Sequence, residues 1–371
     1  MHPAKYNFKE IISQFALHGE IKDIHPFGSG HINDTFRLQN ADNRKPDYLL
    51  QRVNHTVFKD IPSLMENIQY VTEHIRKKLE ATRITDKFRR VLTLVPAKNN
   101  QIYFKDTEGN FWRIFYFINR TVSYDIVSTR QQANEGGRAF GQFQRWLSDF
   151  KPGILKDTIP DFHNIEKRYK KFAYGITADP VGRVKEVEPE IEFVMDRIDS
   201  MGTILRNGEA GIIPLRITHN DTKFNNVLFD EKDRALCVID LDTVMPGYLA
   251  YDFGDSIRTI VNTAAEDEKE LQKIDVNIQF FKAFTLGFIK ETTGLLSKEE
   301  IELLPMGALL LPYMMGLRFL TDYIEGDVYY KIHSPGHNLQ RARAQFQLLR
   351  KLEAIYPALK KIVLDAAEKY K

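Results

Sequence analysis

The spacing of apolar residues changes near position 120, and this change constrains the fold of the 371-residue chain more than any other feature. Before it, short apolar runs separated by turns predict strands, with one helix over 63–81. After it, a β-rich segment at 215–243 interrupts long helical patterns, which cover 129–150, 186–206, 271–293, 297–322 and 337–369. This order predicts an α+β, bilobal chain with a β-rich N-terminal lobe (1–119) and a mainly helical C-terminal lobe (120–371). A ligand is expected in the cleft between the lobes.

The first third of the chain is expected to form a small sheet. Residues 21–39 are typical of a hairpin that turns on Gly28, Ser29 and Gly30, and 47–54 suits a third strand. Three further apolar runs, "VLTLV", "QIYFKD" and "FWRIFYFI", are separated by Asn-Asn and Glu-Gly-Asn turns and supply the remaining strands.

Charge and composition exclude several classes of protein. The formal net charge is only +2, whereas binding to nucleic acid or to an anionic membrane needs a strong basic surplus. The single cysteine, Cys237, lies in an apolar stretch, which predicts a small buried core residue and a reducing, cytoplasmic location. The first residues contain no apolar signal-peptide segment. No heptad seam appears, so a monomer is expected.

The most apolar stretch, 303–317, is expected to lie in the core. It has 15 residues and two prolines, whereas a bilayer span needs about 20 apolar residues. We therefore predict a buried, kinked helix or a helix pair in the core, and no membrane contact.

The β-rich segment carries the chemistry. Asp221 and Asn226 stand in the pattern H-x-D-x-x-x-x-N, and an apolar strand, a turn and a second strand ending at Asp240 follow. Pairing of the two strands brings Asp240 back beside Asn226, and Asp242 shares the strand face of Asp240. Phosphoryl transfer needs a carboxylate near the acceptor hydroxyl and magnesium ligands near the nucleotide phosphates. The hairpin supplies both, and Lys223 is placed to steady the transferring phosphoryl group.

The stretches "THNDTKFNNVLFD" and "IDLDTVMPG" resemble the aminoglycoside phosphotransferase and choline kinase-like family of small-molecule kinases. The resemblance implies the bilobal protein-kinase-like fold, ATP as co-substrate and Mg²⁺ as cofactor. Further stretches, among them "FGSGHINDTF", "WRIFYFINRTVSYDIV" and "GLRFLTDYIEGDVYY", resemble the N-acetylhexosamine 1-kinases of that family over about residues 8–370. This implies transfer from ATP to the anomeric hydroxyl of N-acetylglucosamine or N-acetylgalactosamine.

The resemblance also implies a role for each site residue. Asp221 would be the general base toward the sugar, and Asn226 and Asp240 the magnesium ligands, with Asp242 as a further ligand or substrate contact. The turn Gly28-Ser29-Gly30 would lie over the ATP phosphates, and Phe117, Ile118 and Asn119 would form the hinge that contacts adenine. The sugar pocket would include Arg318 and Tyr329.

The third strand departs from the wider kinase pattern. Protein kinases place a phosphate-binding lysine there, often paired with a helix glutamate. This chain has Gln51 and Arg52 at that place. Arg52 can replace the lysine if its face of the strand points into the cleft, with Glu66 as its candidate partner.

Other functions remain open at this point. The acceptor could be another small alcohol, such as an aminoglycoside, choline, homoserine or a different sugar. The chain could also be a catalytically inactive nucleotide-binding module, although the full set of Asp221, Asn226 and Asp240 argues against that. A protein kinase is disfavoured because no A-P-E element follows the metal aspartate.

A second kinase-like motif, "YDFGD" at 251–255, is expected to serve a different purpose. The position of the metal aspartate is already taken by Asp240, at the end of the returning strand. Asp252 and Asp255 lie at the start of a predicted helix, and we expect them to cap it or to support the catalytic loop from behind.

Overall fold

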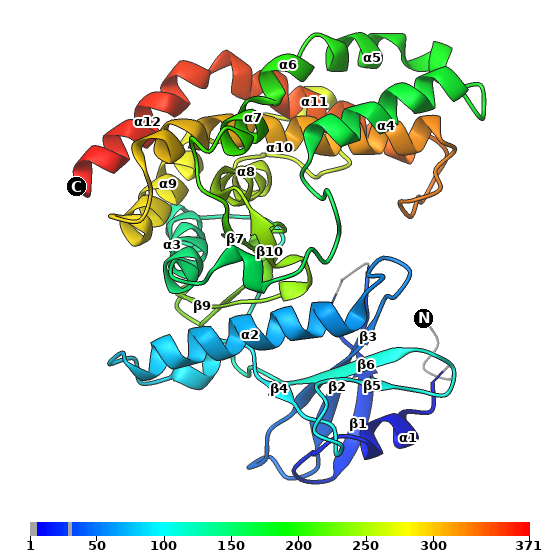
Figure 1. The fold of residues 1–371 in the computed structure, drawn as a ribbon, viewed down its shortest axis with the longest axis vertical. Coiled ribbons are helices and arrows are strands. Elements are labelled where there is room, and N and C mark those ends of the chain that lie inside the picture. Colours follow the sequence, from blue (N-terminus) through cyan, green and yellow to red (C-terminus); the bar gives the residue numbers. More distant parts are fainter. Residues whose placement is uncertain (1–5, 29–31) are drawn as a thin grey trace.

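The computed structural model describes residues 6–28 and 32–371, and it has a sheet-rich N-terminal part and a helical C-terminal part (Figure 1). The predicted turn residues Ser29 and Gly30 lie outside the described residues. The α+β organisation, with a β-rich N-terminal lobe and a helical C-terminal lobe, that was expected from the change in apolar spacing is confirmed.

The N-terminal sheet is wholly antiparallel, in the order β1-β2-β3-β6-β4, with β5 also paired to β6. Its strands are β1 (Ile21–Pro26), β2 (Asp34–Asn40), β3 (Tyr48–Val53), β4 (Leu94–Val95), β5 (Phe104–Lys105) and β6 (Phe111–Tyr116). The predicted hairpin and third strand are therefore present, while β4 and β5 are shorter than the apolar runs that predicted them.

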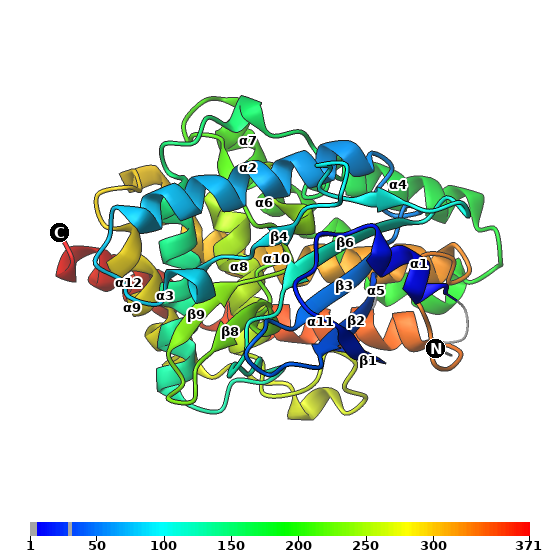
Figure 2. The same ribbon diagram turned by 90° about the horizontal axis from the view of Figure 1, so that it is seen from below.

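Alternation along the strands divides the sheet into two apolar faces. One face, with Leu50 and Trp112, packs against α1 (Phe8–Ser13). The other face, with Val53 and Phe115, joins the main core. The predicted helix α2 (Ile61–Glu80) lies between the sheet and the helical lobe (Figures 1 and 2).

The side chain of Asn67 ties α2 to the helical lobe. Its amide nitrogen donates to the carbonyls of Lys156 (2.7 Å) and Val244 (3.2 Å), and its amide oxygen accepts from the Lys156 N–H (3.1 Å). Asn67 is buried, so these bonds satisfy polar groups that would otherwise be costly between the lobes.

The C-terminal lobe is helical around two short β pairs. Its helices are α3 (Arg130–Leu147), α4 (Ile165–Ala178), α5 (Glu188–Met195), α6 (Ile198–Met201), α7 (Thr203–Glu209), α8 (Leu249–Ile260), α9 (Ile278–Thr292), α10 (Lys298–Ile324), α11 (His337–Ala354) and α12 (Tyr356–Lys369). The prediction missed α4. It also merged α5, α6 and α7 into one helix, and α11 with α12, although the chain breaks at Ile355, before a proline.

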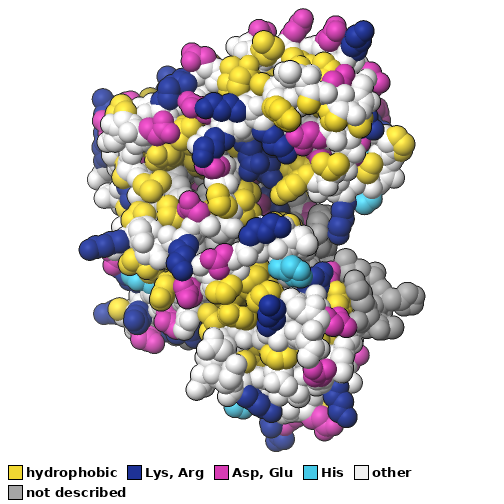
Figure 3. Space-filling view, turned by 45° about the vertical axis from the view of Figure 1, so that its right-hand side comes forward, with side chains coloured by type: hydrophobic (Ala, Val, Ile, Leu, Met, Phe, Trp, Pro, Cys, Tyr) yellow, Lys and Arg dark blue, Asp and Glu magenta, His cyan; other side chains and the backbone are white. Residues whose placement is uncertain are grey.

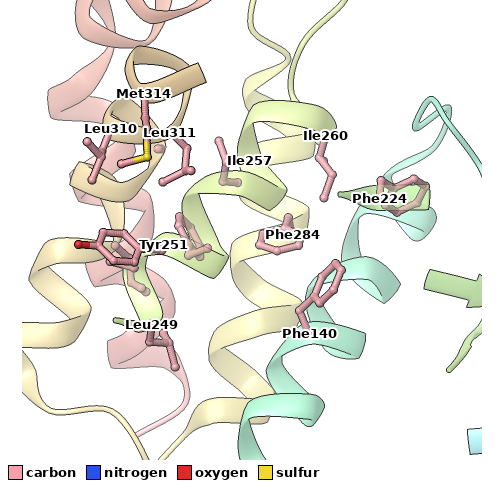
Figure 4. Close-up of a cluster of buried hydrophobic side chains, with 14 of the residues drawn as sticks. Phe140, Phe224, Leu249, Tyr251, Ile257, Ile260, Phe284, Leu310, Leu311 and Met314 are labelled. Atoms are coloured by element: carbon pink, nitrogen blue, oxygen red, sulfur yellow. The ribbon is translucent and has the colours of Figure 1, made fainter. Parts of the chain in front are cut away.

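Helix α10 is the predicted apolar helix, and it continues through Pro305 and Pro312. It is the one described helix long and apolar enough to cross a membrane, but 83% of its most apolar window is buried inside the fold, as in a core helix. It crosses α8 so closely that a Cβ on Gly254 would meet the Gly307 carbonyl oxygen at 2.1 Å. This contact fixes α8 in the apolar cluster behind the catalytic loop (Figure 4).

Candidate active site

The catalytic segment forms two β pairs around one loop. β7 (Arg216–Thr218) leads into the loop and pairs with β10 (Met245–Gly247), and β8 (Val227–Phe229) pairs with β9 (Ala235–Val238). The register sets Val227 opposite Val238, and the next N–H, of Ile239, donates to the Asn226 carbonyl at 2.9 Å. The predicted return of the second strand toward Asn226 is thus confirmed, with Asp240 one residue beyond.

Asp221 lies at the centre of this loop. Its carboxylate contacts the ammonium of Lys223 at 3.1 Å and accepts from the Asn226 amide at 3.2 Å. That amide also donates to the Asp221 carbonyl, at 2.8 Å. Burial raises the pKa of Asp221, but the charge and the hydrogen bond of Lys223, together with the charges of other nearby groups such as Arg258, outweigh it and hold the pKa below the usual value. The side chain is 26% exposed, so it is an ionised carboxylate that a substrate hydroxyl can reach.

Asp240 differs from every other carboxylate in the loop. Its backbone has φ 60°, in the left-handed region that is uncommon for residues other than glycine. Among the described residues, its carboxylate has no hydrogen-bond or ion-pair partner. Water reaches the residue, but the surrounding protein atoms desolvate its carboxylate, and this effect together with the charges of Asp242 and Asp221 raises its pKa to about 7. A carboxylate in this state is stabilised by a cation.

Asp242 has partners that the sequence did not predict. Its two oxygens accept from the guanidinium of Arg113 on β6, one of them at 3.0 Å, and the Asn33 amide donates to it at 2.7 Å. Arg113 is 2% exposed and also donates to Gln51 at 2.9 Å. Both oxygens of Asp242 are therefore engaged in joining the lobes, which argues against the expected role as a direct metal ligand.

The rear of the loop is held by Asp252. Its carboxylate accepts from the backbone N–H groups of His219 (2.8 Å) and Asn220 (2.7 Å) and from the Gln144 amide (2.8 Å). The residue is 1% exposed, and burial raises its pKa to about 6. Of the two roles expected for this aspartate, the structure shows support of the loop from behind.

Neighbouring groups complete this rear network. The Nδ1 of His219 accepts the Asp221 N–H at 3.3 Å, so its proton lies on Nε2, which donates to the Ile239 carbonyl at 2.9 Å. The Thr222 hydroxyl donates to the Asp252 carbonyl, and Asp255 pairs with Arg258 at 2.9 Å on the same helix. Together these bonds fix the backbone that carries Asp221.

Arg52 and Glu66, whose pairing the sequence left open, do not contact each other. The Arg52 guanidinium contacts Asp34 at 2.6 Å, on the face of the sheet that packs against α1, and Glu66 instead contacts Lys156 at 3.5 Å. Alternation along β3 turns the neighbouring residue, Gln51, toward the helical lobe. On that face the guanidinium of Arg113, from the adjacent strand β6, contacts Gln51 at 2.9 Å.

Two predicted nucleotide-binding segments lie near each other. Gly28 has φ 78° and an exposed backbone, and a Cβ there would meet nothing within 4 Å. The ring of the preceding residue, Phe27, packs edge-on against Phe117 at 5.2 Å. The carbonyls of Ile118 and Asn119 accept from Thr121 (2.8 Å) and Arg89 (3.0 Å), so this connector between the lobes is held in place.

The predicted acceptor residues lie on one wall of the helical lobe. The guanidinium of Arg318 lies 5.4 Å from the Phe162 ring and 5.6 Å from the Tyr330 ring. Tyr329 is 57% exposed, and its ring packs edge-on against Tyr330 at 4.8 Å. Tyr330 rather than Tyr329 is the tyrosine that covers Arg318. Figure 3 shows Lys and Arg side chains gathered in a hollow of this lobe.

The residues at the loop fit a metal that is shared with a nucleotide. Within residues 6–28 and 32–371, no three His, Cys, Asp or Glu side chains converge into a preformed metal site. Asn226 and Asp240 offer an amide oxygen and an unpartnered carboxylate from one hairpin. Mg²⁺ is commonly bound through one or two such ligands together with substrate phosphates.

Sequence reasoning missed the residues that join the lobes, Arg113 and Asn33. A signal was present for the first, because an arginine inside the apolar run "FWRIFYFI" is costly to bury unless it is paired. No local pattern identifies its partner, which lies 129 positions away.

A β-rich lobe over a helical lobe, with the carboxylates of Asp221 and Asp240 and the amide of Asn226 on one hairpin between them, is the arrangement of a small-molecule phosphotransferase with an alcohol group as acceptor. The chain belongs to the phosphotransferase enzyme family, because that family's model matches residues 23–274, more than half of its length.

Solved structures agree on the fold. An aminoglycoside phosphotransferase from Alicyclobacillus acidocaldarius is 12% identical, with 96% of each chain covered and a TM-score of 0.63. A microcompartment-associated aminopropanol kinase is 13% identical, with 94% of this chain and 96% of that chain covered and a TM-score of 0.64. An amicoumacin kinase in complex with AMP-PNP, Ca²⁺ and Ami is 14% identical, with coverages of 94% and 96% and a TM-score of 0.59.

Proposed function

We propose that this enzyme transfers the γ-phosphoryl group of ATP to the anomeric hydroxyl of an N-acetylhexosamine, giving the sugar 1-phosphate and ADP. The observation that carries the transfer is the pairing of Asp221 with Lys223 in a reachable loop, beside Asp240, which has no partner in the described part of the chain. The sugar is proposed from the resemblance of the outer stretches of the sequence to N-acetylhexosamine 1-kinases, and from the basic wall around Arg318.

In the proposed reaction, Asp221 orients the acceptor hydroxyl and takes its proton as the oxygen bonds to the γ-phosphorus and the bond to ADP breaks. The low pKa of Asp221 keeps it ionised, and therefore able to accept that proton, at neutral pH. Lys223 lies 3.1 Å from this carboxylate, close enough to stabilise charge on the transferring group.

Asn226 and Asp240 would hold Mg²⁺ against the nucleotide phosphates. Bound there, the ion neutralises charge that develops on the phosphate oxygens. The turn at Gly28 would approach the phosphates through its backbone, and the connector from Phe117 to Asn119 would contact the adenine.

Phosphorus NMR on reactions with ATP, Mg²⁺ and a panel of free sugars and amino alcohols tests the proposal. We expect an anomeric phosphate on N-acetylglucosamine or N-acetylgalactosamine, with loss of the reducing end. A product phosphorylated at the 6-hydroxyl, or turnover of an amino alcohol only, would overturn the assignment of the sugar.

Asp221→Asn tests the base. We expect turnover to fall by about 10²–10⁴-fold, because proton transfer is lost while the nucleotide contacts are kept. Asp199→Asn is the matched control, since that side chain is 99% exposed. Near-normal turnover in Asp221→Asn, with ATP binding unchanged, would remove the base assignment.

A further inference from the structure

The guanidinium of Arg113 on β6 is held by groups from three different segments. Its Nε donates to the Gln51 amide oxygen at 2.9 Å, and its two terminal nitrogens donate to the two carboxylate oxygens of Asp242, one of them at 3.0 Å. One of these nitrogens also lies 3.9 Å from the Met65 sulfur on α2. The side chain is 2% exposed, so its guanidinium is committed to protein groups rather than open to a nucleotide phosphate.

Asp242 accepts three hydrogen bonds from the N-terminal lobe. Besides the two from Arg113, the Asn33 amide donates to it at 2.7 Å, and the Asn33 amide oxygen accepts from the Asn54 N–H at 3.0 Å. The Asp242 side chain is only 4% exposed. A buried ion pair is often no more stabilising than apolar residues of similar volume, so stability alone is a weak explanation for this one. Its place in the catalytic loop points to a role in geometry.

The pair lies directly after an unfavourable backbone conformation at the candidate metal ligand. Asp242 belongs to the 3₁₀ turn Leu241–Thr243, and Asp240, which precedes this turn, has φ 60° and ψ 59°. A left-handed backbone is unfavourable for residues other than glycine and persists only where the surrounding structure holds it. On one side of Asp240, the Ile239 N–H donates to a carbonyl of the loop at 2.9 Å. On the other side, Arg113 holds Asp242.

A row of side chains extends this contact across the N-terminal sheet. The strand register sets Thr35 opposite Gln51 and Gln51 opposite Arg113, and the Gln51 amide donates to the Thr35 hydroxyl at 3.1 Å. The row therefore connects β2, the strand that follows the turn at Gly28, to Asp242 in the catalytic loop. Gln51 is uncharged where a protein kinase has its phosphate-binding lysine, and the positive charge of this row is that of Arg113.

We propose that Arg113 is a positioning residue for the metal ligand: by pairing with Asp242, it holds the left-handed turn that presents Asp240 to a divalent cation bound together with a nucleotide. Asp242 is then an anchor of the loop and not itself a ligand, because both of its oxygens are bonded to Arg113. This inference rests on the metal role proposed for Asp240, and it does not depend on which alcohol accepts the phosphoryl group.

The test measures binding of AMP-PNP to the whole chain by calorimetry, once with Mg²⁺ and once in EDTA. The ratio of the two Kd values gives the coupling between nucleotide and metal, and it requires no acceptor. Arg113→Lys keeps the charge but not the planar fork that bonds both Asp242 oxygens. We expect the coupling to fall by about 10-fold in this variant, because contacts behind a metal ligand typically change metal affinity by that much. The Kd in EDTA should stay within about 2-fold of wild type.

The double variant Arg113→Met, Asp242→Leu separates positioning from stability. Replacing both charges with apolar side chains should leave the midpoint of urea denaturation near that of wild type. The coupling should nevertheless fall by about 10- to 100-fold, because the turn is no longer held. Arg197→Met is the control, since it removes an ion pair with Glu353 (2.8 Å) in the helical lobe and should leave the coupling unchanged.

Wild-type coupling in the double variant, or unchanged or stronger coupling in Arg113→Lys, would overturn the inference. Asp240→Asn is measured alongside these variants. If coupling is lost in Asp240→Asn but kept in both Arg113 variants, the inference fails while the proposed metal site stands. If Asp240→Asn keeps the coupling, or if Mg²⁺ does not strengthen AMP-PNP binding to the wild type, the proposed metal site fails as well.

Discussion

The catalytic loop has an aspartate on each side, and the two aspartates lie in opposite environments. On the rear side, Asp252 accepts three N–H bonds and is buried. On the cleft side, Asp240 has no partner among the described residues and is reached by water. The rear carboxylate is satisfied by the protein itself, whereas the front one is left for a ligand. The number of hydrogen-bond partners that an aspartate has in the protein, and not the surrounding motif, thus distinguishes a structural aspartate from a candidate metal ligand.

This comparison explains the second kinase-like motif. The segment "YDFGD" has the sequence of a magnesium-binding element. Its first aspartate, Asp252, instead accepts hydrogen bonds from the backbone of the catalytic loop. Figure 4 shows its neighbour Tyr251 at the edge of the apolar cluster formed by α8, α9 and α10. The motif thus begins a core helix rather than lining the cleft.

Between the front and rear aspartates of the loop, the largest expected effect is on turnover in Asp240→Asn. Loss of the charged metal ligand should reduce turnover by about 10²–10³-fold and weaken the dependence of the rate on Mg²⁺ concentration. The fold should be kept, because no described group loses a partner. Initial rates over a Mg²⁺ titration measure this, with Asp199→Asn as the surface control. An unchanged Mg²⁺ dependence would contradict the metal assignment.

A smaller effect, on stability, is expected in Asp252→Asn. The amide can no longer accept all three N–H groups, and its own NH₂ faces donors, so the free energy of unfolding should fall by about 2–4 kcal/mol. Urea denaturation measures this. Among the molecules that stay folded, the Mg²⁺ dependence of the rate should be near normal. Equal weakening of Mg²⁺ dependence in Asp240→Asn and Asp252→Asn would break the comparison.

The smallest expected effect is on the pH dependence of the metal-free protein. The pKa of Asp240 rises from 3.8 to about 7 on folding, so between these values the folded protein holds a proton that the unfolded chain has released. Its stability should therefore fall as pH rises through that window, and level off above it. Asp240→Asn should show a shallower decline. Thermal melts in EDTA measure the difference, and identical pH profiles would contradict the raised pKa.

Much of the fold follows from local pattern. Apolar spacing identified the sheet-rich and helical lobes, the helix at α2 and the core helix at α10. Boundaries failed where tertiary contacts or single breakers decide them, as in the division of α11 from α12 at Ile355. Helix α4 was missed, because only a few of its residues are buried and its apolar stripe is weak.

The candidate site likewise contains residues that the sequence predicts and contacts that it does not. Asp221, Asn226 and Asp240 lie within one hairpin, and their convergence follows from strand pairing that the sequence encodes over 20 residues. The partners of Asp242 and Arg52 could not be predicted from the sequence, because each pairing depends on which face of a strand meets a distant segment.

The amino-acid sequence by itself determined the class of fold and the hairpin with its base and its candidate metal ligands, since both depend on near neighbours. Only the tertiary structure decided that Arg113 faces the helical lobe and that Asp252 holds the loop from behind. Charges that are far apart in the chain become coupled only when packing removes the water between them.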